Sequence, residues 1–167
     1  MMFSEKLKKS SLAGACVLIC MISCGCSTIA SWFEKDPAKV ICHITTDATV
    51  NPNIDNEATA VTLQLLQLNN PEIFNQGQFI DLYTRTAEVL NASLVANTTV
   101  NSVLPNSQTT VDPLLNDKTT HIAVLAGFSK YDNSNAKAII PIKNKGDTIE
   151  LELNITGLKM ELKLKEK

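Results

Sequence analysis

Strict two-residue alternation near the C-terminus constrains the fold more than any other feature of the chain. Apolar side chains fill every second position of two consecutive segments: Ile149, Leu151, Leu153 and Ile155, then, after Gly157, Leu158, Met160, Leu162 and Leu164. This period is typical of strands with one buried and one exposed face. The exposed positions are mainly acidic in the first segment and mainly basic in the second, which favours an antiparallel hairpin. Its apolar face needs an opposing layer.

Further strand patterns recur along the chain, at residues 39–46, 61–68, 93–96, 99–104, 109–115, 121–128 and 136–142. The 121–128 segment is the most apolar stretch beyond the leader, which predicts a central strand buried on both faces. Pro113 interrupts 109–115 and indicates an edge. Between strands, apolar spacing of three to four predicts one helix near 78–90, with Gly77 separating it from a short turn. We therefore expect an all-β fold, a two-sheet β-sandwich with one inserted helix.

The N-terminus has the pattern of a secretory leader. Three lysines precede an apolar run that ends in small residues and cysteines, Ser23-Cys24-Gly25-Cys26. The run is short for a membrane-spanning helix, and a cysteine at the cleavage point is typical of a bacterial lipoprotein signal. Cys24 or Cys26 is then the lipidated residue, with Cys24 slightly favoured. A plain signal peptide and an uncleaved anchor are the alternatives.

These patterns predict three parts: a signal peptide over residues 1–23, a lipidated tether over 24–38 and the β-sandwich domain over 39–167. No Asp follows either candidate cysteine, which favours the outer membrane over retention in the inner one. We therefore expect a protein that is lipid-anchored in the outer membrane and faces the periplasm.

Charge and cysteine content narrow the function classes. Loss of Glu5 and three lysines with the leader reduces the 17 acidic and 15 basic residues to 16 and 12, a net charge near −4. Without a basic patch, nucleic acid is not an expected partner. Cys42 is the one cysteine within the domain, so a disulfide scaffold is excluded. We expect a small buried apolar residue there, with a disulfide to the unlipidated cysteine as the alternative.

Catalytic and ligand-binding patterns are sparse. His43 and His121 lie in separate strand patterns without a supporting cluster of metal ligands, so we expect no metal and no cofactor. No nucleophile motif or phosphate-binding glycine motif occurs, and Asp132 is a lone acid in a polar loop. The sequence therefore predicts that the protein is not an enzyme. The aromatic candidates for stacking on a sugar are Trp32, Tyr83 and Tyr131.

Four segments, in order, resemble the TssJ family of outer-membrane lipoproteins of bacterial type VI secretion systems. They are Val50-Asn51-Pro52-Asn53 with the strand 60–68, Phe74 to Tyr83, Leu104-Pro105-Asn106-Ser107, and His121 to Phe128. Several positions depart from the family pattern: Asn53 replaces an acidic residue, Asn106 a turn glycine and Ser129 a basic residue. A Trp-Arg pair that often follows the 129–135 loop is also missing, with Ala136-Lys137 near its place.

The resemblance implies a transthyretin-like two-sheet sandwich with an added helix and a structural role. It implies that the domain binds the periplasmic C-terminal region of the inner-membrane protein TssM, in a complex that TssL completes. In the family the loop between the first two strands contributes to TssM binding. By position that loop is 47–59 here, with Asn51, Pro52, Asn53 and Asp55 expected to be the most exposed.

Alternatives remain open at this point. The Asn-Pro-Asn segment could shape the loop without touching a partner, since loops do both. If it binds, we expect hydrogen bonds and shape rather than an apolar patch, and the 129–135 loop is the next candidate interface. The other reading of the whole chain is a lipid-anchored β-sandwich that binds carbohydrate or peptidoglycan.

Overall fold

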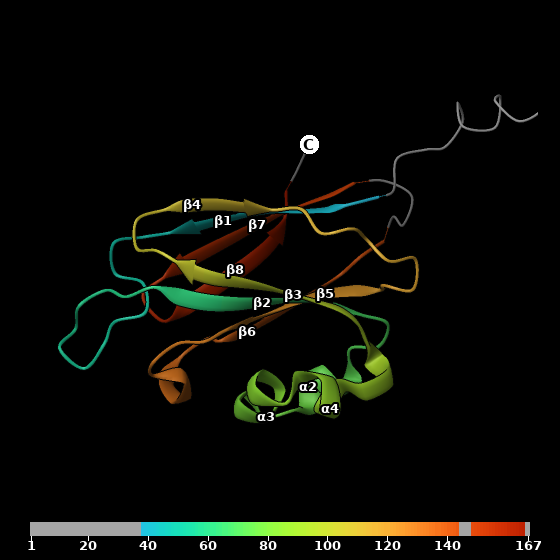
Figure 1. The fold of residues 1–167 in the computed structure, drawn as a ribbon, viewed down its shortest axis with the longest axis horizontal. Coiled ribbons are helices and arrows are strands. Elements are labelled where there is room, and N and C mark those ends of the chain that lie inside the picture. The colour runs from blue at the N-terminus through green and yellow to red at the C-terminus, as the bar shows by residue number, and fades with distance from the viewer. Residues whose placement is uncertain (1–37, 144–147, 166–167) are drawn as a thin grey trace, which may run out of the picture. The chain divides into compact units, whose positions relative to one another are not determined.

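Two four-stranded sheets pack face to face in the computed structural model, which describes residues 38–143 and 148–165 (Figure 1). One sheet has the order β4-β1-β7-β8, and the other has the order β3-β2-β5-β6. The strands of the first sheet are β1 Val40–Thr46, β4 Gln108–Val111, β7 Ile149–Thr156 and β8 Lys159–Leu164. Those of the second are β2 Val61–Leu68, β3 Leu94–Val103, β5 His121–Ala126 and β6 Lys137–Pro141. The predicted two-sheet sandwich is confirmed.

The C-terminal hairpin forms as its alternation predicts. β7 and β8 pair antiparallel, with Glu152 opposite Lys163 on the outer face. Their apolar side chains at alternate positions point into the core between the sheets, where Leu151 and Leu153 are fully buried. β1 completes this layer by pairing with β7 in parallel, and buries Val40, Cys42 and Ile44. Burial raises the pKa of the Cys42 thiol to about 12, which keeps it protonated and unreactive.

β5 is buried on both faces because the domain has a second core. Ile122 and Val124 face the other sheet, whereas Ala123 and Leu125 face a layer of three short helices. These helices are α2 Glu72–Gln76, α3 Phe79–Thr84 and α4 Thr86–Leu90, followed by the 3-10 turn η2 Asn91–Ser93. They lie against the outer face of the second sheet and bury Phe74, Leu82 and Leu90 (Figure 1).

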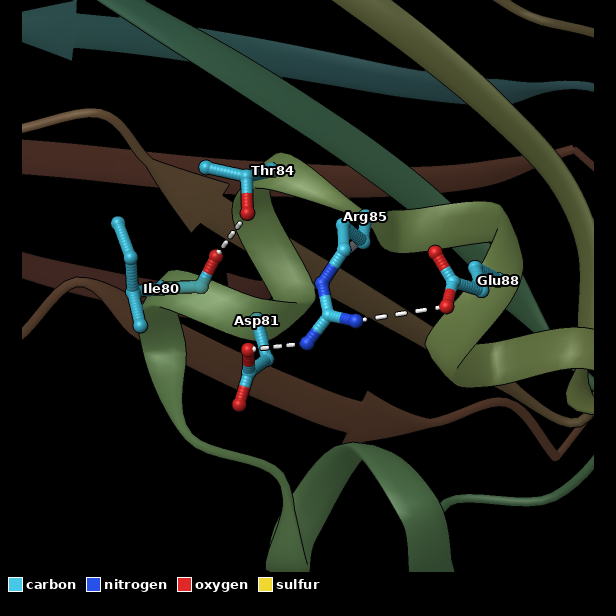
Figure 2. A network of polar contacts seen from close by, with 5 residues as sticks. All are labelled: Ile80, Asp81, Thr84, Arg85 and Glu88. Atoms are coloured by element: carbon cyan, nitrogen blue, oxygen red, sulfur yellow. Dashed lines mark hydrogen bonds and ion pairs between the residues drawn. The ribbon is translucent and has the colours of Figure 1, made fainter.

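The single helix predicted near 78–90 is wrong in detail, because the segment breaks at Arg85. Arg85 has non-helical dihedral angles, φ −129° and ψ 40°. The hydroxyls of Thr84 and Thr86, on either side of it, donate hydrogen bonds to backbone carbonyls four residues earlier. Such bonds slightly destabilise and often bend helices. The Arg85 guanidinium donates to Asp81, at 2.6 Å, and to Glu88, at 3.3 Å, and so joins α3 to α4 across the break (Figure 2).

A lysine of the second sheet fastens the helical layer. The Lys137 ammonium donates to the carbonyls of Phe74, at 2.8 Å, and Gly77, at 2.6 Å, which are acceptors at the C-terminal end of α2. It also lies over the Phe74 ring, 5.1 Å from the centroid. A cation at this end of a helix is favourable because the last carbonyls lack partners.

Two other strand boundaries differ from the sequence prediction. Residues 93–96 and 99–104 belong to one strand, β3, which runs unbroken from Leu94 to Val103 with irregular register near each end. The 109–115 segment narrows to the four-residue strand β4, and Pro113 lies just beyond it. β4 is an edge strand, as Pro113 indicates.

Candidate partner-binding site

The β1–β2 loop, residues 47–60, projects past the ends of the strands at the left of Figure 1. Its base is fastened to neighbouring turns by backbone hydrogen bonds. The Asp47 N–H donates to the Ile155 carbonyl at 3.1 Å, and the Asn51 N–H donates to the Gly157 carbonyl at 2.9 Å. Gly157 turns the chain between β7 and β8 with a positive φ of 57°, which glycine adopts without strain. The loop is therefore held to the sandwich at its base.

The carboxylate of Asp47 organises the first turn of the loop. Partial burial would raise the pKa of Asp47, but hydrogen bonds from the Thr49 N–H and hydroxyl, with a longer one from the Gly157 N–H, outweigh it. The net effect lowers the pKa of Asp47, because the charged form accepts these bonds. This turn is consequently more stable with Asp47 ionised.

Asn51 is buried, which corrects the expectation that it is among the most exposed residues of the loop. Only 5% of it is accessible, and its φ is 48°, a left-handed value that asparagine tolerates. Its side-chain amide donates to the Ala60 carbonyl at 2.8 Å and the Thr59 hydroxyl at 3.0 Å. Its side-chain oxygen accepts the Ser129 N–H at 2.7 Å. Asn51 thus closes the loop and ties it to residue 129.

Asn53 shapes the next turn. Its side-chain oxygen accepts the N–H groups of Asp55 and Glu57, each at 2.9 Å, which is typical of an asparagine at a turn. The preceding residue, Pro52, offers its carbonyl to the Ser129 hydroxyl at 2.9 Å. Pro52 and Asn53 are half-buried, whereas Asp55 is exposed as expected.

The tip of the loop carries a residue that the sequence reasoning missed. Ile54 is 88% exposed, the highest value among the large exposed apolar residues of the described part of the chain. Asp55, Asn56 and Glu57 follow it in sequence and are exposed as well. The available signal was one large apolar residue in an otherwise polar loop, without strand or helix periodicity. The tip therefore presents an exposed apolar side chain next to polar ones in the sequence, and not polar groups alone.

The 129–135 loop belongs to the same surface. Ser129 bonds to both Asn51 and Pro52, and the loop continues through the 3-10 turn η3, Tyr131–Asn133. Both loops extend from the same end of the sandwich (Figure 1). We refer to residues 47–60 and 129–135 together as the loop end.

Tyr131 connects the loop end to the helical layer. Its ring stacks on Phe79, which stacks on Tyr83, with centroids 5.3 Å apart in both pairs. Gly127 permits this packing, since a Cβ at that position would lie 2.2 Å from the Tyr83 oxygen. Burial raises the pKa of Tyr83. Each of the three rings packs on another ring of the domain, so these aromatic side chains contribute to packing within the domain. Trp32, the third aromatic candidate for a sugar contact, lies outside the described residues.

The two histidines are far apart in the topology. His43 lies on β1 and bonds to the Thr110 hydroxyl at 3.2 Å, while His121 begins β5 in the other sheet. Residues 38–143 and 148–165 contain no group of three or more metal-ligating side chains. In the same ranges, none of the helices has the length and apolar character that crossing a bilayer requires. Cys24 and Cys26 lie outside the described residues.

Comparisons with known proteins agree with this architecture. Residues 38–165 match the family model T6SS-SciN, described as type VI secretion lipoprotein, VasD, EvfM, TssJ. A search among curated proteins found no match. The crystal structure of the lipoprotein TssJ1 from Pseudomonas aeruginosa has a TM-score of 0.72 at 15% identity, over 78% of this chain and 98% of that one.

Two further solved structures share the fold. Serratia marcescens Lip, a membrane-bound component of the type VI secretion system, has a TM-score of 0.70 at 16% identity, over 78% of this chain and 99% of Lip. A chain in a structure titled for the TssM C-terminal domain from EAEC has a TM-score of 0.60 at 15% identity, over 77% of this chain and 98% of that one. The family match spans most of the chain, and the chain therefore belongs to the type VI secretion lipoprotein family that includes TssJ.

Proposed function

We propose that the protein is anchored in the outer membrane and that its loop end binds the periplasmic C-terminal domain of a TssM-like inner-membrane protein. TssL belongs to the same complex. In this proposal residues 1–23 are removed as a signal peptide, and Cys24 or Cys26 carries the lipid. Residues 24–38 form the tether, and residues 39–167 form the binding domain. Membership of the type VI secretion lipoprotein family supports the anchor and the secretion system.

The direction of β1 is the observation that carries the proposal. The chain enters the sandwich at Ala38, whose carbonyl accepts the Leu115 N–H at 2.8 Å. β1 then crosses the sheet, and the β1–β2 loop follows at its opposite end. Seven residues of strand span roughly 20 Å. A lipid on the N-terminal side of Ala38 would therefore attach the sandwich to the membrane through the end opposite the loop end. The loop end would then point into the periplasm, toward a partner from the inner membrane.

The loop end has the composition of a small protein-binding site. An exposed apolar side chain surrounded by polar groups resembles the anchor and rim of protein interfaces. Ile54 supplies the anchor, and Asp55 and Glu57 lie beside it in sequence. Hydrogen bonds in which Asn51, Asn53 and Ser129 take part hold the loop before binding, which lowers the entropy lost on association. A solved structure of the TssM C-terminal domain contains a chain that shares this fold, which is compatible with a TssM-like partner.

Purification from membranes tests the proposal. The full chain, tagged at its C-terminus, is extracted in mild detergent from cells that also carry the TssM-like protein. We expect the partner to co-purify, and the chain to incorporate a palmitate analogue. A Cys24→Ser/Cys26→Ser double variant should lose the label. Undiminished labelling of the double variant would refute the anchor, and recovery of the intact chain without the partner would refute the interaction.

A further inference from the structure

Three of the four edge strands in the sandwich carry features that block pairing with another chain. β4 has only four residues and is followed by Pro113. β8 carries Lys159, Glu161 and Lys163 along its length. β6 contains Lys137 and ends at Pro141, and the residue pair Asn135 and Lys159 bridges its start to β8. Charges, prolines, short length and cover are the usual means by which proteins protect sheet edges.

β3 lacks charged residues and prolines and is not short, and the irregularities in its pairing with β2 lie only near its two ends. It is ten residues long, and no charged residue occurs between Glu88 and Asp112 in the sequence. β2 is its one strand partner in the described part of the chain, so β3 forms an edge of that sheet. Asn97, Thr99 and Asn101 are exposed. An exposed, uncharged strand of high β-propensity is a template for further strand pairing.

The regular part of β3 is its centre. The register with β2 shifts between Val103 and Val100 and again between Ala96 and Leu94. Residues 96–100 therefore form an uninterrupted ladder. Ala96, Thr98 and Val100 oppose Gln67, Leu65 and Leu63, and so point to the inner side of the sheet. Asn97 and Thr99 point to the other side.

We propose that the free edge of β3 pairs antiparallel with β3 of a second copy of this chain. A two-fold axis at Thr98 would place Asn97 opposite Thr99 and Ala96 opposite Val100. Opposed residues then share a face of the joined sheet, as antiparallel pairing requires. No like charges meet in this arrangement, and the two β-branched Thr98 side chains lie opposite each other, which stabilises sheets. Self-complementarity of this kind is what a two-fold dimer interface needs, and an identical strand supplies it.

Disulfide trapping tests the geometry in the full chain. Membranes that carry Thr98→Cys are oxidised and compared with wild type, which reports any background from the native cysteines. Directly opposed residues of antiparallel strands have Cα atoms about 4.5–5.5 Å apart, within the range that a disulfide bridges. Asn101→Cys is the control, because its two copies would lie roughly 20 Å apart. We expect about tenfold more cross-linked dimer from Thr98→Cys than from either control, because only that pair meets the disulfide distance.

Introducing lysines on the edge strand β3 provides the second test. Two differently tagged full-length copies are co-expressed, and capture of one should recover the other. Asn97→Lys/Thr99→Lys should abolish this recovery, whereas Gln108→Lys/Thr110→Lys adds the same charge to β4 and should leave it unchanged. Equal cross-linking at positions 98 and 101, or an adduct with a different protein in place of the dimer, would overturn the proposal. So would undiminished recovery of the lysine variant. If that variant does not fold, the disulfide result decides.

Discussion

Asn51 offers the sharpest test of how the loop end is built. Its side chain makes three hydrogen bonds, to Ala60, Thr59 and Ser129. Each contributes about 1 kcal/mol net, so removal of the amide costs about 3 kcal/mol. Alanine at the left-handed φ of this residue adds about 1–2 kcal/mol. Asn51→Ala should therefore lower the free energy of unfolding by about 4 kcal/mol.

A glycine at the same position separates the two contributions. Asn51→Gly avoids the left-handed strain but gives the unfolded chain more freedom, which costs about 0.5–1 kcal/mol. Both variants should therefore lose similar stability in guanidinium denaturation of the sandwich domain, with an unchanged m-value.

The control is Asn56→Gly, at another positive φ whose side chain makes no hydrogen bond among the described residues. Asn56→Gly should stay within about 1 kcal/mol of wild type. If Asn51→Gly did so too, backbone strain in the alanine variant, and not loss of the buried amide, would explain the effect of Asn51→Ala, and the reasoning would be refuted.

Three further changes test other parts of the structure. Gly127→Ala should destabilise the domain by about 1–3 kcal/mol, because the new methyl group displaces the Tyr83 ring, and thermal melting measures this. Lys137→Met should cost about 1.5–3 kcal/mol in denaturant, since two carbonyls at the end of α2 lose a charged donor. The pKa of Asp47 is lowered in the fold, so its contribution is present above the unfolded value of about 3.9 and is lost as pH falls through the folded value. An acid titration of stability should accordingly be flatter for Asp47→Asn than for wild type.

Local patterns were sufficient to predict much of the fold. The β7–β8 hairpin follows from alternation, since each strand has one buried and one exposed face. The strongly apolar β5 was predicted as a strand buried on both faces, and the helical layer explains why. Alternation does not reveal which strands pair with each other. The parallel pairing of β1 with β7, more than a hundred residues apart, has no local signature.

The loop end shows the same division. Turn residues correctly marked 47–59 as a loop, and Asn53 has the turn-forming role that asparagine often has. The burial of Asn51 depends on Ser129, 78 residues away, which no local pattern reveals. The break at Arg85 depends on ion pairs and threonine hydrogen bonds that compete with helix periodicity. Sequence reasoning therefore located the loop and the exposure of Asp55, but missed the burial of Asn51 and the exposure of Ile54.

Titration calorimetry of the TssM-like partner domain against an Ile54→Asp variant tests the central claim most directly. Ile54 is 88% exposed, so the variant should fold as stably as wild type. Leu114→Asp is the matched control, because Leu114 is 60% exposed and lies beside the start of β1, at the opposite end of the sandwich. We predict that Ile54→Asp weakens binding by more than about tenfold, or about 1.4 kcal/mol, and that Leu114→Asp binds like wild type. Equal affinity of Ile54→Asp and wild type would contradict the account and move the interface away from the tip of the β1–β2 loop.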